Sequence, residues 1–238
     1  MISYLKSLAV KAIEYHAKAL VKQMALNERD IFHQIQKIAT QEAVEYVRSN
    51  MPAVVGLKSD EVLLRYAIDK APAEGLVLEF GVFKGRTIKV IAAATQRTVH
   101  GFDSFEGLPE DWVGWKQPAG YFALKGALPA VPANVVLHKG WFKDTLPGFV
   151  AGTDQPVAFA HIHCDLYSST RDVFAALGNR IRPGTVLAFH EYLNYGGWRD
   201  HEFRAFQEFV KERDVKYKYL AYSSSEAGQV CLVIESIR

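Results

Sequence analysis

The chain has 238 residues, 49% of them hydrophobic and 23% charged, and its formal net charge is +2. This balance suits one sizeable α/β domain or two small ones, and it gives no overall attraction to nucleic acid. No stretch approaches the roughly 20 apolar residues of a membrane span, and the N-terminus lacks the pattern of a secretory signal. We therefore expect a cytoplasmic protein in which Cys164 and Cys231, far apart and inside apolar runs, are reduced.

Residues 1–50 are predicted to form an N-terminal helical extension. Apolar residues recur at helical spacing within 13–24 and 32–46, and Asn27 and Asp30 stand between the two stretches. The first 24 residues carry four lysines against one glutamate, so the first helix could lie on a membrane surface or on a partner. We favour packing on its own domain or on a dimer mate, and expect the extension to support self-association or to cover the site.

The remainder, residues 51–238, is predicted to alternate strands with helices. Helices are expected over 59–71, 84–96 and 201–213, and over 169–181, where Ser169 and Asp172 have capping-box spacing. Seven strands are expected, at 76–81, 99–103, 134–140, 157–165, 185–192, 215–222 and 228–236. This alternation is typical of a mainly parallel sheet covered on both faces. The short turn between the final two strands makes that pair antiparallel.

In such a sheet a ligand binds beyond the carboxyl ends of the strands. Glu79, Gly81 and Gly85 follow the first strand, where glycines permit close backbone approach and the next helix offers free N–H groups. Asp103 ends the second strand, 24 residues after Glu79, and its carboxylate could accept both hydroxyls of a ribose. This pairing favours an adenosine-containing cofactor. The glycines follow G-x-x-x-G and lack the G-x-G-x-x-G fingerprint, which argues against NAD.

Four segments together resemble a known family: LEFGVFKGRT, FDSFEGLPEDW, KGWFKDTLP and CDLYSSTRDVF. They look like class I S-adenosylmethionine-dependent methyltransferases and, more narrowly, like the macrocin O-methyltransferase family, which methylates sugar hydroxyls of macrolides. The resemblance covers roughly residues 54–235. It implies an α/β fold with a Rossmann-like, seven-stranded, mainly parallel sheet whose last strand is antiparallel, in agreement with the strand count. It also implies S-adenosyl-L-methionine as the cofactor.

The resemblance further implies roles for individual residues. The cofactor would be bound by Glu79, Gly81, Gly85, Asp103, Ser104, Gly140, Trp141, Phe142 and Asp144. Among these, the backbone of Gly81 would hold the methionine end, Asp103 would take the ribose hydroxyls, and the last four would border the adenine. Asp165 would face the methyl group and the acceptor.

Residues 109–130 are rich in turn formers and aromatic side chains, and they are predicted to form a lid-like loop over the site. In such a lid, Trp112, Trp115 and Tyr121 could pack on a substrate. They could equally serve only to anchor the loop, and the sequence does not separate these two interpretations.

Two strand ends carry the predicted chemistry. Asp165 lies at the ligand-facing end of FAHIHCD, with His161 and His163 deeper in the sheet, and the next strand ends in His190 and Glu191. We expect Asp165, His190 and Glu191 to converge. Members of the family carry two adjacent acids at the end of this next strand. Those two acids and the aspartate together hold magnesium. Histidine departs from that pattern, because magnesium prefers oxygen ligands.

Two mechanisms follow from this departure. A metal ion that tolerates imidazole could bind Asp165, His190 and Glu191 and lower the pKa of the acceptor hydroxyl. Alternatively, His190 could act directly as the general base, since the ordinary histidine pKa of about 6.5 suits neutral pH. In both mechanisms Asp165 and His190 are the catalytic candidates, and the activated oxygen attacks the sulfonium methyl in line.

The leading interpretation is an S-adenosylmethionine-dependent O-methyltransferase that acts on a hydroxyl of a small metabolite, such as a glycoside or another natural product. We expect a homo-oligomer that does not bind nucleic acid and has no membrane-spanning segment. The alternatives are a related adenosine-cofactor enzyme on the same fold, and a non-catalytic cofactor-binding or scaffold protein in which the His-Glu pair marks lost chemistry.

Overall fold

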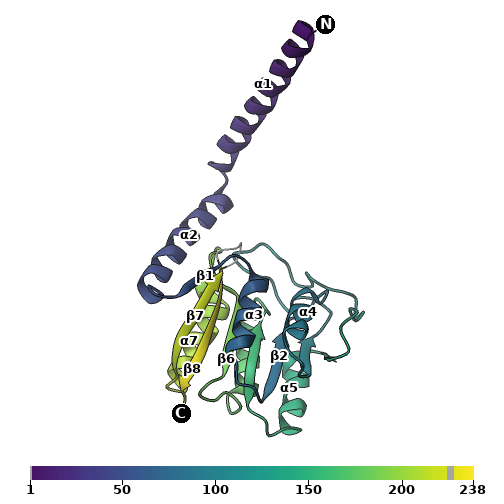
Figure 1. The fold of residues 1–238 in the computed structure, drawn as a ribbon, viewed down its shortest axis with the longest axis vertical. Coiled ribbons are helices and arrows are strands. Elements are labelled where there is room, and N and C mark those ends of the chain that lie inside the picture. Colours follow the sequence, from purple (N-terminus) through teal and green to yellow (C-terminus); the bar gives the residue numbers. More distant parts are fainter. Residues whose placement is uncertain (1, 224–227) are drawn as a thin grey trace.

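The computed structural model describes residues 2–223 and 228–238. They form an eight-stranded sheet of order β1-β7-β8-β6-β5-β2-β3-β4, with helices around it (Figure 1). The strands are β1 (Val55–Leu57), β2 (Leu76–Phe80), β3 (Val99–Asp103), β4 (Val135–Lys139), β5 (Val157–Ile162), β6 (Val186–Leu193), β7 (Lys216–Ser223) and β8 (Gly228–Ser236). The helices are α1 (Ile2–Asn27), α2 (Ile31–Asn50), α3 (Asp60–Lys70), α4 (Arg86–Ala93), α5 (Phe142–Ala151), α6 (Tyr167–Leu177), the 3-10 helix η1 (Trp198–Asp200) and α7 (Glu202–Glu212).

The predicted Rossmann-like, mainly parallel sheet is confirmed. The last strand, β8, runs antiparallel to both of its neighbours, β6 and β7, and the other neighbouring strands pair in parallel. The sequence pattern does not predict the eighth strand, β1, which pairs with β7 at the edge of the sheet. With only three residues, β1 is too short to display an alternation of apolar and polar side chains.

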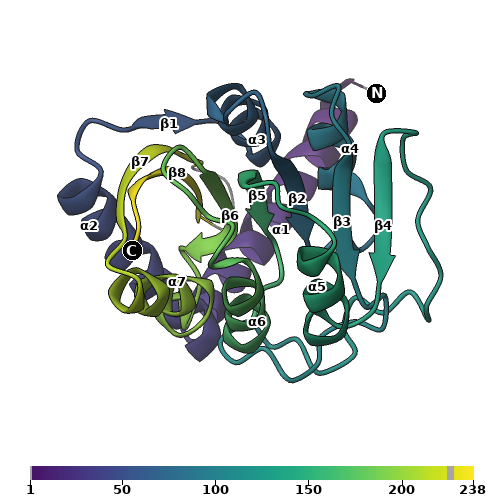
Figure 2. The same ribbon diagram turned by 90° about the horizontal axis from the view of Figure 1, so that it is seen from below.

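Helices cover both faces of the sheet, with α5, α6 and α7 on one face and α3 and α4 on the other (Figure 2). Along β2, Leu78 and Phe80 pack in the core beneath α5 to α7, whereas Val77 packs in the core beneath α3 and α4. Every residue of β2 and β5 is buried. Strands buried on both faces read as continuous apolar runs, which is why the sequence pattern reveals them.

Two helix starts test the local predictions. Ser59 caps α3 as expected, because its hydroxyl accepts a hydrogen bond from Val62 N at 3.3 Å. The capping-box assignment of Ser169 is wrong: α6 begins at Tyr167, after Leu166, so Ser169 lies inside the helix. Helix α5 is absent from the predicted elements, and Pro147 within it explains the miss, since proline is unfavourable inside a helix.

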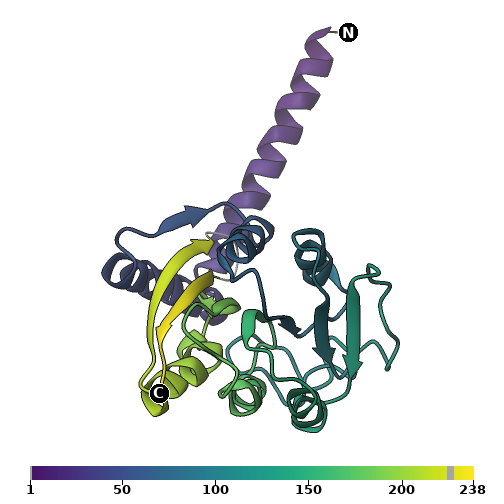
Figure 3. The same ribbon diagram turned by 60° about the horizontal axis from the view of Figure 1, so that its bottom comes forward.

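The two N-terminal helices differ in their contacts. Asp30 separates them and caps α2, accepting a hydrogen bond from His33 N at 2.9 Å. Helix α2 packs on the sheet domain through Ala39 and Ala43. Helix α1 projects away from the rest of the molecule (Figure 1, Figure 3). Among the described residues, no helix is both long and apolar enough to cross a membrane.

Candidate active site

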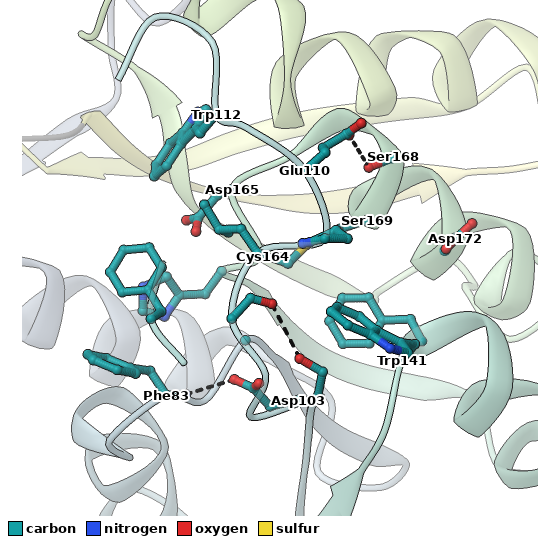
Figure 4. A pocket seen from close by; sticks show the side chains of 18 of the residues that line it. Phe83, Asp103, Glu110, Trp112, Trp141, Cys164, Asp165, Ser168, Ser169 and Asp172 are labelled. Carbon is teal, nitrogen blue, oxygen red and sulfur yellow. Dashed lines mark hydrogen bonds between the residues drawn. The ribbon is translucent and has the colours of Figure 1, made fainter. Parts of the chain in front are cut away.

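A pocket of about 590 Å³ opens beyond the carboxyl ends of the parallel strands (Figure 4). It lies where β2 and β5 are neighbours and their chain connections lead to opposite sides, to β3 and to β6. Such a switch point is the general ligand site of open α/β sheets. Of the predicted site residues, the pocket is lined by Gly81, Asp103, Ser104, Gly140, Trp141, Phe142, Asp165 and Glu191. The lining does not include Glu79, Gly85, Asp144 or His190.

Asp103 organises the loop that follows β2. Its Oδ2 accepts hydrogen bonds from the backbone N–H groups of Val82 and Phe83, both at 2.8 Å, and its Oδ1 accepts one from Phe105 N at 2.6 Å. A carboxylate has about four acceptor positions, so these bonds leave roughly one for a ligand hydroxyl. The carboxylate is therefore held rigidly at the pocket, and most of its capacity holds the protein's own backbone.

Gly81 is required by the sheet itself. Its φ is +90°, and a Cβ atom added there would lie 1.8 Å from the carbonyl oxygen of His163. The atoms that leave no room for a side chain at Gly81 thus belong to His163, directly after β5. The sequence predicts a ligand in that place. Gly85, at φ +78°, begins helix α4. A Cβ atom added at Gly85 would make only ordinary van der Waals contacts, the nearest at 3.6 Å.

The predicted adenine border forms one wall of the pocket at the start of α5. Gly140, Trp141 and Phe142 line it, and Trp141 stands across the pocket from Asp165 (Figure 4). Asp144, in the first turn of α5, is exposed, and Lys143 lines the pocket in its place.

Residues of the predicted lid line one side of the pocket. Trp112 and Trp115 line the pocket, whereas Tyr121 does not. His201 Nε2 donates a hydrogen bond to Val113 O at 2.9 Å, which fixes the tip of the loop to the start of α7. Trp112 is 3% exposed and packs in the main core, so it both lines the pocket and anchors the loop.

A hydrogen bond joins the loop to the opposite wall. The Ser168 hydroxyl on α6 donates to Glu110 Oε1 at 2.6 Å (Figure 4). Both residues line the pocket. The bond therefore closes the pocket between the loop and α6.

Three buried carboxylates gather where β5 and β6 end. Asp165 and Glu191 line the pocket, and Glu202, the first residue of α7, lies behind them. Burial, and after it the charges of Glu191 and Glu202, raise the pKa of Asp165 well above its ordinary value. Burial and the charge of Glu191 raise the pKa of Glu202 in the same way. A bound cation would favour the ionised forms of these groups.

Glu202 is a site residue that the sequence analysis misses. The pattern of residues 201–213 reveals only the apolar face of a helix. An acid at the first helical position, directly after the connection from β6, is a signal that could have singled it out.

His190, the predicted catalytic group, does not line the pocket. It shares a face of β6 with Ala188, so it lies beneath α3 while Glu191 faces the pocket. Its Nδ1 is hydrogen-bonded to Glu191 Oε1, and its Nε2 lies 3.4 Å from Asp60 Oδ2. Burial alone would lower the pKa of His190, but the charges of Glu191 and Asp60 outweigh it and raise the pKa to about 10. A raised pKa disfavours both predicted roles of His190, because a general base and a metal ligand need the neutral imidazole.

The predicted trio of ligands is also not brought to one point. Among the described residues, the groups whose ligand atoms all lie within 4.8 Å of one another do not include Asp165 with His190 and Glu191. His163 takes part instead, in a group with His190 and Glu191. Its ring stacks on that of His190 at a centroid distance of 4.0 Å, and it lines the pocket.

Glu79 lies behind the pocket on the α4 side of β2. It is fully buried, and its Oε1 is 2.8 Å from His161 Nδ1. Burial raises the pKa of Glu79 to about 8 and lowers that of His161 well below its ordinary value. The pair is therefore a core contact beneath the loop that carries Gly81.

Known proteins share this arrangement. The chain matches a family model described as a methyltransferase domain over residues 78–192. A protein of Streptomyces olivaceus, 8-demethyl-8-(2,3-dimethoxy-alpha-L-rhamnosyl)-tetracenomycin-C 4'-O-methyltransferase, is 32% identical over 58% of this chain. The match spans 62% of that relative's length. The chain therefore contains a segment, residues 78–192, that is similar to a methyltransferase domain.

Solved structures agree with the methyltransferase fold. The calicheamicin methyltransferase CalS11 is 22% identical, with a TM-score of 0.57, and the match covers 84% of this chain and 91% of CalS11. The O-methyltransferase NovP is 23% identical, with a TM-score of 0.50, over 74% of this chain and 80% of NovP. The predicted Rossmann-like methyltransferase fold is thus confirmed. The likeness to the macrocin O-methyltransferase family stays a prediction.

Proposed function

We propose that the protein is an O-methyltransferase that transfers the methyl group of S-adenosyl-L-methionine to a hydroxyl of a small metabolite. The observation that carries this proposal is the pair of buried, pocket-facing carboxylates: Asp165 just past the end of β5, and Glu191 in β6 past its pairing with β5. Proton removal from a hydroxyl requires such a group within reach of the acceptor. The Streptomyces relative, whose name describes a 4'-O-methyltransferase, supports the same reaction.

The cofactor would extend along the carboxyl ends of β2, β3 and β4. We place its methionine end at Gly81, its ribose at Asp103 and Ser104, and its adenine between Gly140 and Phe142. All of these line the pocket. Glu79, Gly85 and Asp144 would support this binding from outside the pocket. The sulfonium would then lie beside the carboxylate cluster, and its positive charge would favour the ionised form of Asp165.

The transfer itself needs one proton acceptor and good alignment. The acceptor's O–H bond breaks as its proton passes to the Asp165 carboxylate, and the oxygen forms a bond to the methyl carbon. The methyl–sulfur bond breaks in line with that attack, and its electron pair stays on sulfur, leaving S-adenosylhomocysteine. His190 supplies a fixed positive charge behind Glu191 and takes no part as a base.

A divalent cation is compatible with the same side chains. Asp165 and Glu191 offer the oxygen donors that magnesium and manganese prefer, and Glu202 adds a third buried acid beside them. When bound, such an ion would lower the pKa of the acceptor hydroxyl. The ion tolerant of imidazole that the sequence analysis considers would need His190 as a ligand, and both ring nitrogens of His190 face protein carboxylates.

We propose a hydroxylated acceptor with a ring that stacks on aromatic side chains, such as a glycoside. Trp112, Trp115 and Tyr195 line the pocket near Asp165, and Tyr195 is buried with its ring 5.6 Å from both tryptophan rings. Flat aromatic faces with few polar groups suit a sugar ring better than a charged ligand. This proposal assigns the loop at 109–130 to acceptor binding.

The first test is cofactor binding followed by turnover. Titration calorimetry with S-adenosylhomocysteine should give a single binding event, and labelled methyl should pass to members of a panel of glycosides. Each reaction is run with and without a chelator, since loss of turnover with the chelator indicates the metal-assisted route. Absence of binding would refute the proposed function. Binding without transfer across the panel would favour the non-catalytic alternative.

We also propose that α1 mediates self-association. One face of this helix carries large apolar side chains that are 53–67% exposed: Val10, Ile13, Leu20, Val21 and Met24. A helix that leaves the molecule with an apolar stripe in water is stabilised by burying the stripe against another helix. A second copy of the chain offers a matching stripe.

A further inference from the structure

Glu202 occupies an unusual place at the start of α7. Its side chain is fully buried, yet it forms no cap on its own helix. Its Oε1 accepts hydrogen bonds from Cys164 N at 3.3 Å and Asp165 N at 3.2 Å, and its Oε2 accepts one from Glu191 N at 3.1 Å. One carboxylate thus ties together the two strand ends that carry the pocket-facing acids.

These three N–H groups lie where the sheet comes apart. The pairing of β5 with β6 ends at Ile162 and Phe189. The pairing of β6 with β8 is interrupted between Phe189 and Leu193. Buried N–H groups need acceptors, and past these points Glu202 supplies acceptors that the neighbouring strands no longer provide.

The backbone of Asp165 makes this contact more demanding. Its φ is +65°, in the left-handed region that residues other than glycine adopt at an energetic cost. Surrounding contacts have to hold such a residue in place. The hydrogen bond from Asp165 N to Glu202 is one of these contacts, and it acts on the residue whose side chain faces the pocket.

A purely structural role does not explain the choice of glutamate. Burying a carboxylate next to Asp165 and Glu191 is unfavourable, because the three groups repel one another. A neutral side chain that accepts hydrogen bonds would join the strands with less repulsion. Glutamate instead offers two acceptor oxygens for the three N–H groups, and the bonds from Glu191 N and Asp165 N favour its ionised form against the effect of burial.

We propose that Glu202 is a positioning residue that sets the geometry of Asp165 and Glu191 for methyl transfer. The inference rests on the proposed function, since it concerns the alignment of the same acids. Glu202 itself does not line the pocket. Its influence on the reaction would pass through the backbone of the two residues that do.

The test compares Glu202→Gln with the matched control Glu212→Gln, an exposed position on the same helix. The amide presents an N–H₂ group to at least one backbone N–H, so one or more of the three bonds is lost. Because a misplacement of about 1 Å can cost about 100-fold in rate, we expect kcat to fall by about 100-fold. KM for the acceptor and the affinity for S-adenosylhomocysteine should stay unchanged. Glu212→Gln should match the wild type.

A second readout is independent of turnover. Amide hydrogen exchange, resolved by NMR, should show faster exchange of the Cys164, Asp165 and Glu191 amides in Glu202→Gln than in the control. Glu202→Asp keeps the charge and shortens the side chain by one methylene, so it should also lower kcat. It serves as the second variant if Glu202→Gln does not fold.

The outcomes separate the two proposals. Faster amide exchange with unchanged kcat in a folded variant would overturn the positioning role and leave a structural tie. A rise in KM or a loss of cofactor affinity equal to the loss in kcat would also overturn it. Failure of the wild type to bind S-adenosylhomocysteine would refute the proposed function, whereas the exchange data would still report on the three hydrogen bonds.

Discussion

The buried Glu79–His161 pair leads to a prediction about stability and pH. Burial raises the pKa of Glu79 from 4.5 to about 8, so between these values the folded protein keeps a proton that the unfolded chain has lost. For an acid with a raised folded pKa, the free energy of unfolding falls as the pH rises through that window. One titrating group changes this free energy by at most about 1.4 kcal/mol per pH unit.

Glu79→Gln removes this titration and keeps an oxygen that can accept a hydrogen bond from His161 Nδ1. Between pH 5 and pH 8, we expect the unfolding free energy of the variant to rise by about 3.5 kcal/mol relative to the wild type, somewhat less than three units at about 1.4 kcal/mol each because the folded-state group is only half titrated at pH 8. Urea unfolding, followed by the fluorescence of buried Trp112 and Trp198, measures this difference. The comparison cancels the other titrating groups. S-adenosylhomocysteine should still bind, since Glu79 does not line the pocket.

The nearby and exposed Glu74 provides the control, because Glu74→Gln should give a stability profile parallel to that of the wild type. If Glu79→Gln also gave a parallel profile, Glu79 would have an ordinary pKa in the folded protein, and the reasoning from burial would be refuted.

Three further changes test other parts of the molecule. Asp103→Ala should weaken S-adenosylhomocysteine binding by about 1.5–3 kcal/mol in calorimetry, because it removes charge-assisted bonds to the loop and to the ligand, and unchanged affinity would contradict this role. His190→Asn should keep turnover within about tenfold, whereas loss of a general base costs about 10²–10⁴-fold, so a loss in that range would restore His190 as the base. Deletion of residues 1–29 should lower the number of chains per particle measured by light scattering and leave cofactor affinity intact. An unchanged number of chains per particle would exclude α1 from the interface.

Much of the fold is predictable from local patterns. Strands buried on both faces, such as β2 and β5, give apolar runs that stand out in the sequence, and Ser59 and Asp30 mark their helix starts by side-chain chemistry. β1 and α5 escape prediction because one is three residues long and the other contains Pro147. Local signals were too weak in both cases.

Part of the candidate site is likewise predictable from local patterns. Parallel strands end at one edge of the sheet, so Asp103 and Asp165 could be placed at the pocket from the strand ends alone. Successive side chains of a strand point to opposite faces, so adjacent His190 and Glu191 in β6 face opposite sides. The predicted convergence of both residues with Asp165 did not take this rule into account. The sequence thus determined which strand ends carry the acids, because period and strand order are local or topological properties.

Only the tertiary structure decided what those residues touch. Glu202 becomes a partner of Asp165 and Glu191 because β5 and β6 separate and a buried helix start fills the gap. Asp60, which is 130 positions before His190 in the chain, helps to keep that imidazole charged. Burial, charge and hydrogen-bond partners depend on segments that are distant in sequence, and for that reason no local pattern announces them.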